Sequence, residues 1–262
     1  MQLESITPLI LTYNESPNID RTLEYLAWAS RIVVIDSLST DITLDILSHY
    51  PTVDIYQRPF DTHAAQWNFG LAKVQTPWCL SLDADYRVLP ALVAELQQLQ
   101  PSATVDGYFA PFHYCVFGQP LKGSILPPRQ VLFRCDRATY IDDGHTQLLQ
   151  VQGQSATLNS PILHDDRKSL NHWLWAQDRY MLLEVKKLTT TPADQLSLAD
   201  KIRKTKVLAP FVVLIYCLVV KGGIFDGWHG WYYALQRFLA ETLLALRLIE
   251  HELTAHPPDQ DA

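Results

Sequence analysis

The sequence contains little of what marks several common protein classes. Only four of its 262 residues are cysteine, and they are scattered without CxxC or His spacing, at Cys79, Cys115, Cys135 and Cys217. This pattern argues against a zinc site or a disulfide framework and fits reduced cytosolic thiols. Basic residues are outnumbered by acidic ones, 21 against 28, and the formal charge is −7. Since binding to nucleic acid needs a basic surface, a nucleic-acid-binding protein is not expected.

Other absences concern nucleotide fingerprints and targeting. No GxGxxG follows the first predicted strand, and neither GxxxxGKS nor GxxxxGKT occurs, so the dinucleotide and P-loop fingerprints are missing. No basic region followed by a long apolar run is present near the first residue, so no signal peptide is expected. With 48% hydrophobic and 19% charged residues, the composition is that of a globular protein with one large domain or one domain plus an appendage.

Strands and helices are predicted to alternate over the first hundred residues. Apolar runs predict strands at 6–13, 31–36, 53–56 and 78–83, and helical spacing follows each of them. This order predicts an α/β fold with a parallel, doubly wound sheet. Because ligands of such sheets bind outside the carboxyl ends of the strands, Thr12 to Glu15, Asp36 and the pair Asp83/Asp85 are expected along one crevice.

The stretch Trp78–Val88 carries the clearest chemical signal. An apolar strand ends in Asp83 and Asp85, whose i, i+2 spacing predicts that both side chains leave the strand on the same side. Two carboxylates can hold a divalent cation that takes its remaining ligands from substrate phosphates. A DxD motif alone is also compatible with a polar turn, as Asp259-Gln-Asp261 near the chain's end illustrates.

Three ordered segments resemble the nucleotide-sugar half of the family 2 glycosyltransferases with the A-type fold. They are Leu11–Glu15, Val33–Thr43 and Leu80–Tyr86, and the similarity covers residues 5–100. It is greatest to the bacterial branch that decorates lipopolysaccharide core and other envelope glycans. The resemblance implies a Rossmann-like half, a mixed central sheet and a hexosyltransferase-type activity.

The resemblance also implies roles for individual residues. Thr12, Tyr13, Glu15 and Asp36 match segments that contact the nucleoside, although a helix cap or a turn is an equal interpretation of Asp36 taken alone. Asp83 and Asp85 match the pair that contacts ribose, metal and diphosphate, with Mg²⁺ or Mn²⁺ as the implied cofactor.

Residues 105–165 are predicted to continue the sheet as short mixed strands. Asp143, and after it Asp142, is the favoured carboxylate to accept the acceptor hydroxyl's proton in an inverting transfer. The envelope-glycan branch often has a His-Glu pair where this chain has His145-Thr146, so His145 is a third candidate base. The alternative is that Asp142-Asp143-Gly144 is only a turn.

Two groups of side chains near these strands have open roles. His164, at the end of the last predicted strand, is a candidate ligand of metal or diphosphate. The acids that follow it, Asp165 and Asp166, fit the first turn of a helix. Lys122, Arg129 and Arg134 are candidates to offset the diphosphate charge, and the sequence does not choose among them.

The C-terminal part differs in charge. Residues 201–250 hold seven Lys and Arg against three acids, a net charge of +4. The apolar run Val207–Val220 is shorter than the roughly twenty residues that span a bilayer and fits an interfacial, re-entrant or buried helix. With the aromatic cluster of residues 228–233 and an amphipathic helix after it, this favours peripheral attachment to the inner, cytoplasmic face of the cell membrane. Packing onto a partner subunit is the alternative.

We therefore predict a glycosyltransferase domain at 1–188, with a nucleotide-sugar half at 1–100 and an acceptor half at 101–188. A linker at 189–200, a helical membrane-associating or oligomerising segment at 201–252 and a disordered tail at 253–262 follow. The predicted activity is metal-dependent, inverting transfer of a sugar from a nucleotide-diphosphate sugar to an envelope glycan or lipid-linked acceptor. The alternatives are a sugar-phosphate nucleotidyltransferase, which normally has a Gly-rich N-terminal loop that this chain lacks, and a non-catalytic membrane-attached scaffold.

Overall fold

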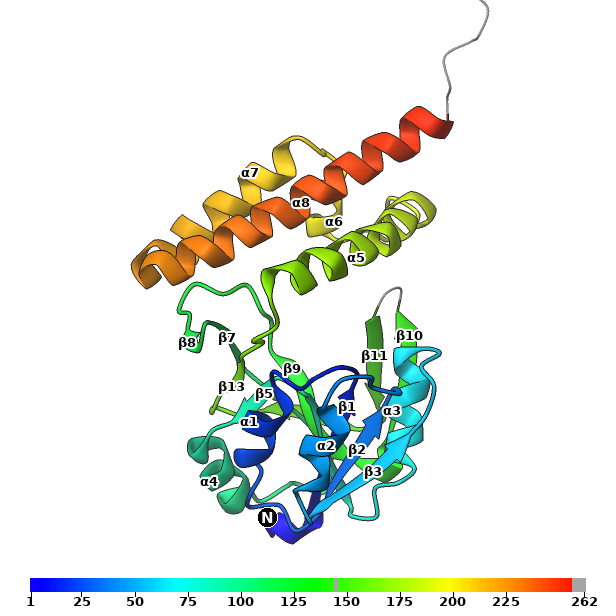
Figure 1. Cartoon of the computed structure of the whole chain (residues 1–262), viewed down its shortest axis with the longest axis vertical. Coiled ribbons are helices and arrows are strands. Elements are labelled where there is room, and N and C mark those ends of the chain that lie inside the picture. The colour runs from blue at the N-terminus through cyan, green and yellow to red at the C-terminus, as the bar shows by residue number, and fades with distance from the viewer. Residues whose placement is uncertain (144–145, 256–262) are drawn as a thin grey trace, which may run out of the picture. The chain divides into compact units, whose positions relative to one another are not determined.

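The computed structural model describes residues 1–143 and 146–255, and the chain forms two compact units (Figure 1). Unit 1 comprises Met1–Pro120 and Leu126–Arg167. Unit 2 comprises Leu121–Ile125 and the chain from Lys168 onward. The α/β class, the mixed central sheet and the C-terminal helices expected from the sequence are confirmed.

A seven-stranded mixed sheet with the order β12-β6-β9-β4-β1-β2-β3 forms the centre of unit 1. Four adjacent parallel strands are those predicted from the apolar runs: β1 (Ile6–Thr12), β2 (Ile32–Asp36), β3 (Val53–Gln57) and β4 (Trp78–Asp83). The remaining strands are β9 (Arg129–Arg134), which is antiparallel to its neighbours β4 and β6, β6 (Val105–Ala110) and β12 (Gln154–Thr157).

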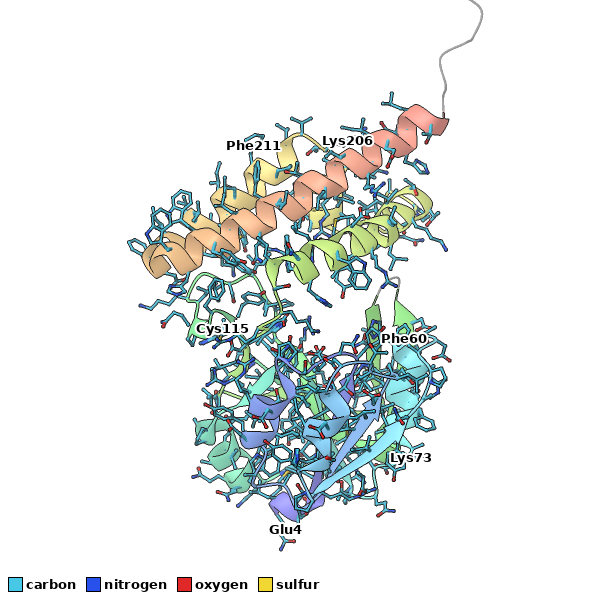
Figure 2. All side chains as sticks on the ribbon, viewed as in Figure 1. Glu4, Phe60, Lys73, Cys115, Lys206 and Phe211 are labelled. Carbon is cyan, nitrogen blue, oxygen red and sulfur yellow. The ribbon has the colours of Figure 1, made fainter. Side chains whose placement is uncertain are left out.

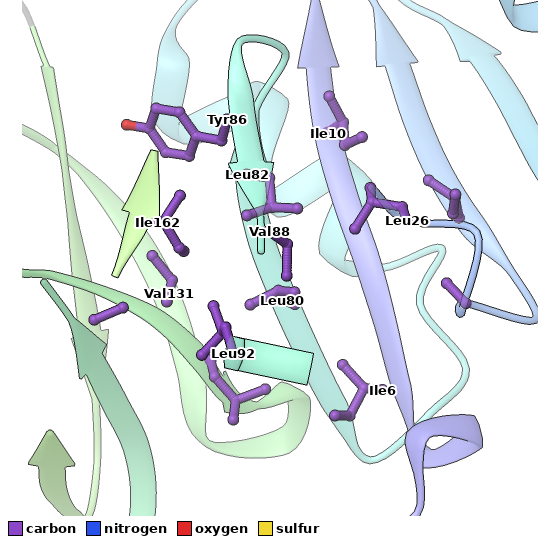
Figure 3. Close-up of a cluster of buried hydrophobic side chains, with 14 of the residues drawn as sticks. Ile6, Ile10, Leu26, Leu80, Leu82, Tyr86, Val88, Leu92, Val131 and Ile162 are labelled. Carbon is purple, nitrogen blue, oxygen red and sulfur yellow. The ribbon is translucent and has the colours of Figure 1, made fainter. Parts of the chain in front are cut away.

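Helices cover both faces of this sheet. They are α1 (Ile19–Glu24), α2 (Thr43–Ser48), α3 (His63–Leu71) and α4 (Pro90–Gln98). Because successive strand residues point to opposite faces, Ile6 and Ile10 of β1 join one core cluster with Leu26 and Leu92 from the α1 and α4 side (Figure 3). Leu9 of the same strand joins a second cluster that contains Trp67 of α3 and is completed by Val33, Ile35 and Phe133. Strands buried on both faces explain the continuous apolar runs of the sequence.

Two smaller sheets complete unit 1. One has the order β5-β13-β7-β8, built from β5 (Tyr86–Val88), β7 (Phe112–Val116), β8 (Gln119–Pro120) and β13 (Ile162–His164). The other is a hairpin of β10 (Ala138–Asp143) and β11 (Thr146–Val151). Short 3-10 turns lie at η1 (Leu3–Ser5) and η2 (Cys135–Arg137). In the β5–β13 pair, His164 lies opposite Tyr86.

Unit 2 is helical. Its elements are α5 (Leu170–Thr190), α6 (Leu198–Arg203), α7 (Leu208–Ile215), the π-helix η3 (Tyr216–Val220), the 3-10 turn η4 (Gly223–Asp226) and α8 (Gly227–Ala255). The long α8 packs against both α5 and α7. Met181, Val185 and Leu188 of α5 meet Leu244 and Leu248 of α8 in a small apolar core.

Several local expectations differ from the structure. Ser16 followed by Pro17 predicts a helix start at Pro17, but α1 begins at Ile19, and the Ser16 amide donates to the Asp41 carboxylate (3.2 Å). The division into units falls before α5, whereas the linker was expected at residues 189–200. The helical spacing of Leu170, Leu174 and Tyr180 predicts that they lie on the core face of α5, but all three are exposed.

Helix α8 extends beyond residue 252, where the sequence predicted the helical segment to end. Residues 253–255, placed by the sequence in a disordered tail, belong to α8, and residues 256–262 lie outside the described residues. Within the described chain no single helix has the length and apolarity to cross a bilayer. Leu208–Val220 and Gly223–Thr254, bent by 71°, reach that length and composition only as a pair.

Candidate functional site

The carboxyl ends of β1, β2 and β4 gather the predicted donor-binding residues at one edge of the sheet. Thr12 of β1 pairs with Asp36 of β2, and Leu11 pairs with Asp83 of β4. Parallel strands end at the same edge, and that edge is where open α/β sheets bind ligands. The edge therefore holds the polar residues from three of the four predicted strand ends.

Asp36 is fully buried and organises the loop that follows β2. Its carboxylate accepts hydrogen bonds from the Thr12 hydroxyl (3.0 Å), the Ser39 hydroxyl (2.5 Å), the Ser39 amide (2.9 Å) and the Gln57 side-chain amide (3.4 Å). Both carboxylate oxygens are thus engaged by protein donors. These contacts are those of a residue that holds a turn, which was the alternative interpretation of Asp36. The contact of Asp36 with a nucleoside stays a prediction.

The loop after β1 presents an aromatic ring beside this edge. Asn14 has φ of 54°, in the left-handed region, and its side-chain oxygen accepts the Thr40 amide at 2.8 Å. The Glu15 amide donates to the Thr43 hydroxyl (2.8 Å), and the Glu15 carboxylate accepts the Asn18 side-chain amide (2.9 Å). These bonds tie the loops after β1 and β2 together and leave Tyr13 with 52% of its surface exposed.

Asp83 and Asp85 face different partners. The Asp83 carboxylate lies 3.5 Å from Nη1 of Arg129, which also donates to the Tyr86 hydroxyl at 2.6 Å. Asp85 Oδ2 lies 3.0 Å from Nε2 of His164. The alternation of strand side chains does not reach Asp85, because β4 ends at Asp83 and residues 84–85 form the turn into β5. The ring of Tyr86 contacts that of His164 edge-on, with centroids 5.2 Å apart, and so connects the two pairs.

The protonation states follow from burial and charge. Burial, together with the negative charge of Asp83, raises the pKa of Tyr86 well above its usual value of 10, so the phenol keeps its proton and can donate to Asp83. Burial lowers the pKa of His164, but the charge of Asp85 and the hydrogen bond to it outweigh this, and the net shift is upward. The site therefore pairs each carboxylate with a cationic or proton-donating neighbour.

Asp85 and His164, two of the predicted metal ligands, lie next to each other and are hydrogen-bonded to one another in this structure. One carboxylate and one imidazole nitrogen converge within 3.0 Å, and Mg²⁺ is usually held by one or two protein carboxylates with substrate phosphates and water completing its shell. Within residues 1–143 and 146–255 no set of three His, Cys, Asp or Glu side chains is arranged as a metal centre. A cation here would therefore depend on oxygen atoms of the substrate.

A buried ion-pair cluster follows His164. Asp165, with no exposed surface, accepts hydrogen bonds from Arg21 Nη1 (2.8 Å), Arg87 Nη1 (2.9 Å) and Arg167 Nε (2.8 Å). Its amide donates to the carbonyl of Asp85 at 2.9 Å, so the segment is tied to the DxD turn. The interpretation of Asp165 as part of a helix's first turn is wrong, because α5 begins only at Leu170.

The structure distinguishes the three basic residues that were candidates to offset the diphosphate charge. Arg129 is beside Asp83, as described above. Arg134 pairs with Asp136 (3.2 Å) and lies opposite Trp78, the first residue of β4, at the other end of that strand. Lys122 belongs to unit 2. Arg129 is thus the candidate that lies next to the carboxylates.

The candidate bases are carried by the β10–β11 hairpin. Asp142 is exposed and pairs with Gln147, and the strand ends at Asp143, opposite Thr146. His145 lies outside the described residues. The base of the hairpin is anchored at Tyr140, whose amide and carbonyl both bond the Asn68 side chain of α3, at 2.9 and 2.8 Å. Nothing in the sequence around Asn68 signalled this anchor.

Comparison with known proteins gives a consistent assignment. Residues 9–149 match the family described as Glycosyl transferase family 2. The lipopolysaccharide core biosynthesis glycosyltransferase LpsC of Rhizobium meliloti (strain 1021) is 32% identical over 99 residues, 36% of each chain. An uncharacterized glycosyltransferase of Rickettsia bellii is 28% identical over 108 residues, 41% of this chain and 36% of that protein. These matches span little more than a third of the relatives' length.

Among solved structures, TarS residues 1–349 of S. aureus in complex with UDP-GlcNAc superposes with a TM-score of 0.51. The superposition covers 95% of this chain and 84% of that one, at 16% sequence identity. At this identity the likeness concerns the fold, which agrees with the mixed sheet and C-terminal helices described above.

Proposed function

The chain belongs to glycosyl transferase family 2, and on that premise we propose that it transfers a sugar from a nucleotide-diphosphate sugar to a hydroxyl group of an envelope glycan or lipid-linked acceptor. The observation that carries the proposal is the cluster of Asp83, Asp85, Tyr86, Arg129 and His164 at the carboxyl end of β4. The similarity to a lipopolysaccharide core glycosyltransferase supports the acceptor class. The UDP-GlcNAc bound to TarS supports the donor class.

The donor's nucleoside would lie along the ends of β1 and β2. Tyr13 offers an exposed ring for stacking on the base, while Thr12 and Glu15 shape the loop through their own hydrogen bonds. Asp36 holds the loop after β2 and meets the base or ribose only if the donor replaces one of its present partners.

The diphosphate would lie over Asp83, Asp85 and His164. Asp85 and His164 would hold Mg²⁺ or Mn²⁺, which neutralises the charge that develops on the leaving diphosphate. Arg129 adds a fixed positive charge beside Asp83, and Tyr86 fixes the position of its guanidinium. Burial lowers the pKa of Arg129, but Tyr86 and the nearby carboxylates raise it more, so the guanidinium stays charged.

The transfer would proceed with inversion. Asp143, or its neighbour Asp142, takes the proton of the acceptor hydroxyl as the oxygen forms its bond to the anomeric carbon. The bond from that carbon to the diphosphate oxygen breaks, and the nucleoside diphosphate leaves with the electron pair. Asp142 is exposed at the end of a hairpin that Asn68 anchors, so an acceptor can reach this position.

We place this chemistry at the inner face of the cell membrane, with the protein attached peripherally. The net charge of +4 in residues 201–250 supports attraction to anionic lipids. The apolar helices of unit 2 support contact with the bilayer surface.

Metal-supported donor binding tests the proposal. We expect calorimetry to detect binding of a nucleoside diphosphate in Mn²⁺, and Asp85→Asn to abolish the metal-dependent part while thermal stability stays near that of the wild type. Release of nucleoside diphosphate from nucleotide sugars, with and without Mn²⁺, is the companion assay. A nucleotidyltransferase would instead release pyrophosphate from a nucleoside triphosphate and a sugar phosphate, and a scaffold would do neither.

A further inference from the structure

Unit 2 exposes a continuous row of large apolar side chains, here called the apolar stripe. Along α7, η3 and the residue before them, its members are between 40% and 68% exposed and recur in pairs four residues apart: Val207, Leu208, Phe211, Val212, Ile215, Tyr216, Val219 and Val220. Beyond the bend it continues through Ile224 (50%), Phe225 (85%) and Trp228 (85%). An apolar patch of this extent is rarely left to water and indicates a partner.

The packing of α7 fixes the direction of the stripe. Ala209, Pro210 and Cys217, on the other side of the same helical run, are buried. Phe211, the stripe member that Figure 2 labels on α7, lies at the border of the two sides: it is 55% exposed, and its ring contacts Phe238 of α8 at a centroid distance of 5.4 Å. Because one side of the run packs against α8, the stripe cannot turn inward without unpacking the helix pair.

Hydrogen bonds and close backbone packing hold the turn at residues 223–230, at the end of the stripe. The Asp226 carboxylate accepts the Gly123 amide at 2.9 Å, and the Tyr233 hydroxyl accepts the Ile125 amide at 3.2 Å. A Cβ added at Gly230 would lie 1.9 Å from the carbonyl oxygen of Gly223, so the backbones pack without room for a side chain. Phe225 and Trp228 therefore project from a rigid turn, and their replacement removes little internal packing.

The charges of unit 2 indicate which kind of partner the apolar stripe contacts. No Asp or Glu occurs between Lys206 and Asp226. Within the described parts of unit 2, Lys201, Lys204 and Lys221 make no ion pair, whereas Lys206 pairs with Glu252. An isologous contact between two copies would bring these lysines together, which like-charge repulsion disfavours. An anionic lipid surface complements them, and Trp and Lys at the edge of an apolar face are typical of the bilayer interface.

We propose that the apolar stripe inserts into the interface of an anionic bilayer, with Phe225 and Trp228 entering the acyl boundary and Lys201, Lys204 and Lys221 at the level of the lipid phosphates. The helices lie in the interface and do not cross it, because Leu208–Val220 is too short to span a bilayer and the chain bends by 71° before Gly223–Thr254. This inference rests on the membrane attachment included in the proposed function and identifies the surface and the lipid class.

The test uses the full-length protein and vesicles of phosphatidylcholine with or without phosphatidylglycerol. We expect flotation of the wild type with the anionic vesicles at low salt, and weaker flotation with the neutral ones. Burial of each aromatic side chain corresponds to about 10- to 100-fold in partitioning, so Phe225→Glu with Trp228→Glu should lower binding by at least about 100-fold. Phe60→Glu, at a 51% exposed phenylalanine of unit 1, is the matched control and should bind as the wild type does.

Two further measurements separate the possible outcomes. Replacing Lys201, Lys204 and Lys221 by glutamine should weaken binding to anionic vesicles and reduce its dependence on salt. Wild-type protein that stays with the soluble fraction at low salt, or a double glutamate variant that binds normally, overturns the inference. So does sedimentation that reveals a dimer dissolved by the double variant. Loss of nucleotide-sugar turnover with vesicle binding intact would count against the proposed transferase chemistry and leave this inference standing.

Discussion

The ion-pair cluster around Asp165 permits a quantitative prediction for Asp165→Asn. Three arginines, at 28%, 19% and 36% side-chain exposure, donate to a carboxylate with no exposed surface. Removing one partner from a buried ion pair typically costs about 3–5 kcal/mol. Because water reaches the guanidinium groups in part, we expect a loss of about 2–4 kcal/mol in the free energy of unfolding of unit 1.

The assay is urea and thermal denaturation of the full-length protein, followed by circular dichroism and tryptophan fluorescence. For a unit of this size, 2–4 kcal/mol corresponds to a decrease in Tm of about 5–15 °C. Asp54→Asn is the matched control, because Asp54 is 48% exposed and pairs with Arg31 at 2.7 Å. An exposed pair of that kind contributes about 1 kcal/mol or less.

Equal unfolding midpoints for Asp165→Asn and Asp54→Asn would refute the reasoning. The three arginines would then be solvated well enough to dispense with the carboxylate. A loss as large as expected would show that the charges of Arg21 and Arg87 hold the segment carrying His164 to α1 and β5.

Three further predictions concern the reaction and pH. Asp143→Asn should lower turnover by about 10²- to 10⁴-fold with donor affinity unchanged in calorimetry, and retained activity together with loss in Asp142→Asn would move the role by one residue. Arg129→Met should lower turnover more than it weakens donor binding, and equal turnover in the two proteins would exclude a role for this charge in the transition state. Burial raises the pKa of Asp200, but the Ser197 hydrogen bonds and the positive charges of Lys187 and Arg203 together lower it by more, so the net shift of this pKa is downward. The stability that Asp200 contributes is therefore present above pH 4 and lost as pH falls, and Asp200→Asn and wild type should differ in unfolding free energy at pH 6 but converge in acid.

The predictable part of the fold consists of features that local patterns encode. Val33 and Ile35 face one side of β2 while Ile32 and Val34 face the other, and all four are buried. A strand covered on both faces has to be apolar throughout, so the runs at 6–13, 31–36 and 78–83 could be read as parallel strands. The position of Asp83 at a strand's carboxyl end followed from the same runs.

The parts that could not be predicted depend on contacts between distant residues. Asp165 lies far along the chain from Arg21 and Arg87, and no periodicity relates them. Thr12 and Ser39 already bond Asp36, which a sequence pattern cannot reveal because any serine or threonine of the loop is an equal candidate. The partner of Asp85 depends on the pairing of β13 with β5, and that register is set by tertiary packing.

The failed burial predictions in α5 have a common physical cause. Amphipathic patterning assumes that apolar side chains face inward and charged ones face water. In α5 the assumption fails in part: Met181, Val185 and Leu188 face inward, but Glu184 is also buried, 3.5 Å from Arg203, while Leu174 is exposed. In α8, Trp231 and Leu235 belong to the apolar face that was expected to contact a membrane or a partner subunit, and both are exposed, whereas Tyr233, Leu244 and Leu248 are buried.

Burying a charged side chain while leaving large apolar ones exposed is unfavourable for a unit surrounded by water on all sides. Burying Glu184 requires a partner such as Arg203, and exposing Trp231, Phe225 and Trp228 gives up apolar burial that a different helix rotation would regain. The arrangement is favourable where the outward face meets a medium as apolar as a protein core. The large exposed apolar side chains of unit 2, beside a buried ion pair, therefore support bilayer contact independently of the net charge. Salt should accordingly weaken vesicle binding without abolishing it, because only the lysine contribution is screened.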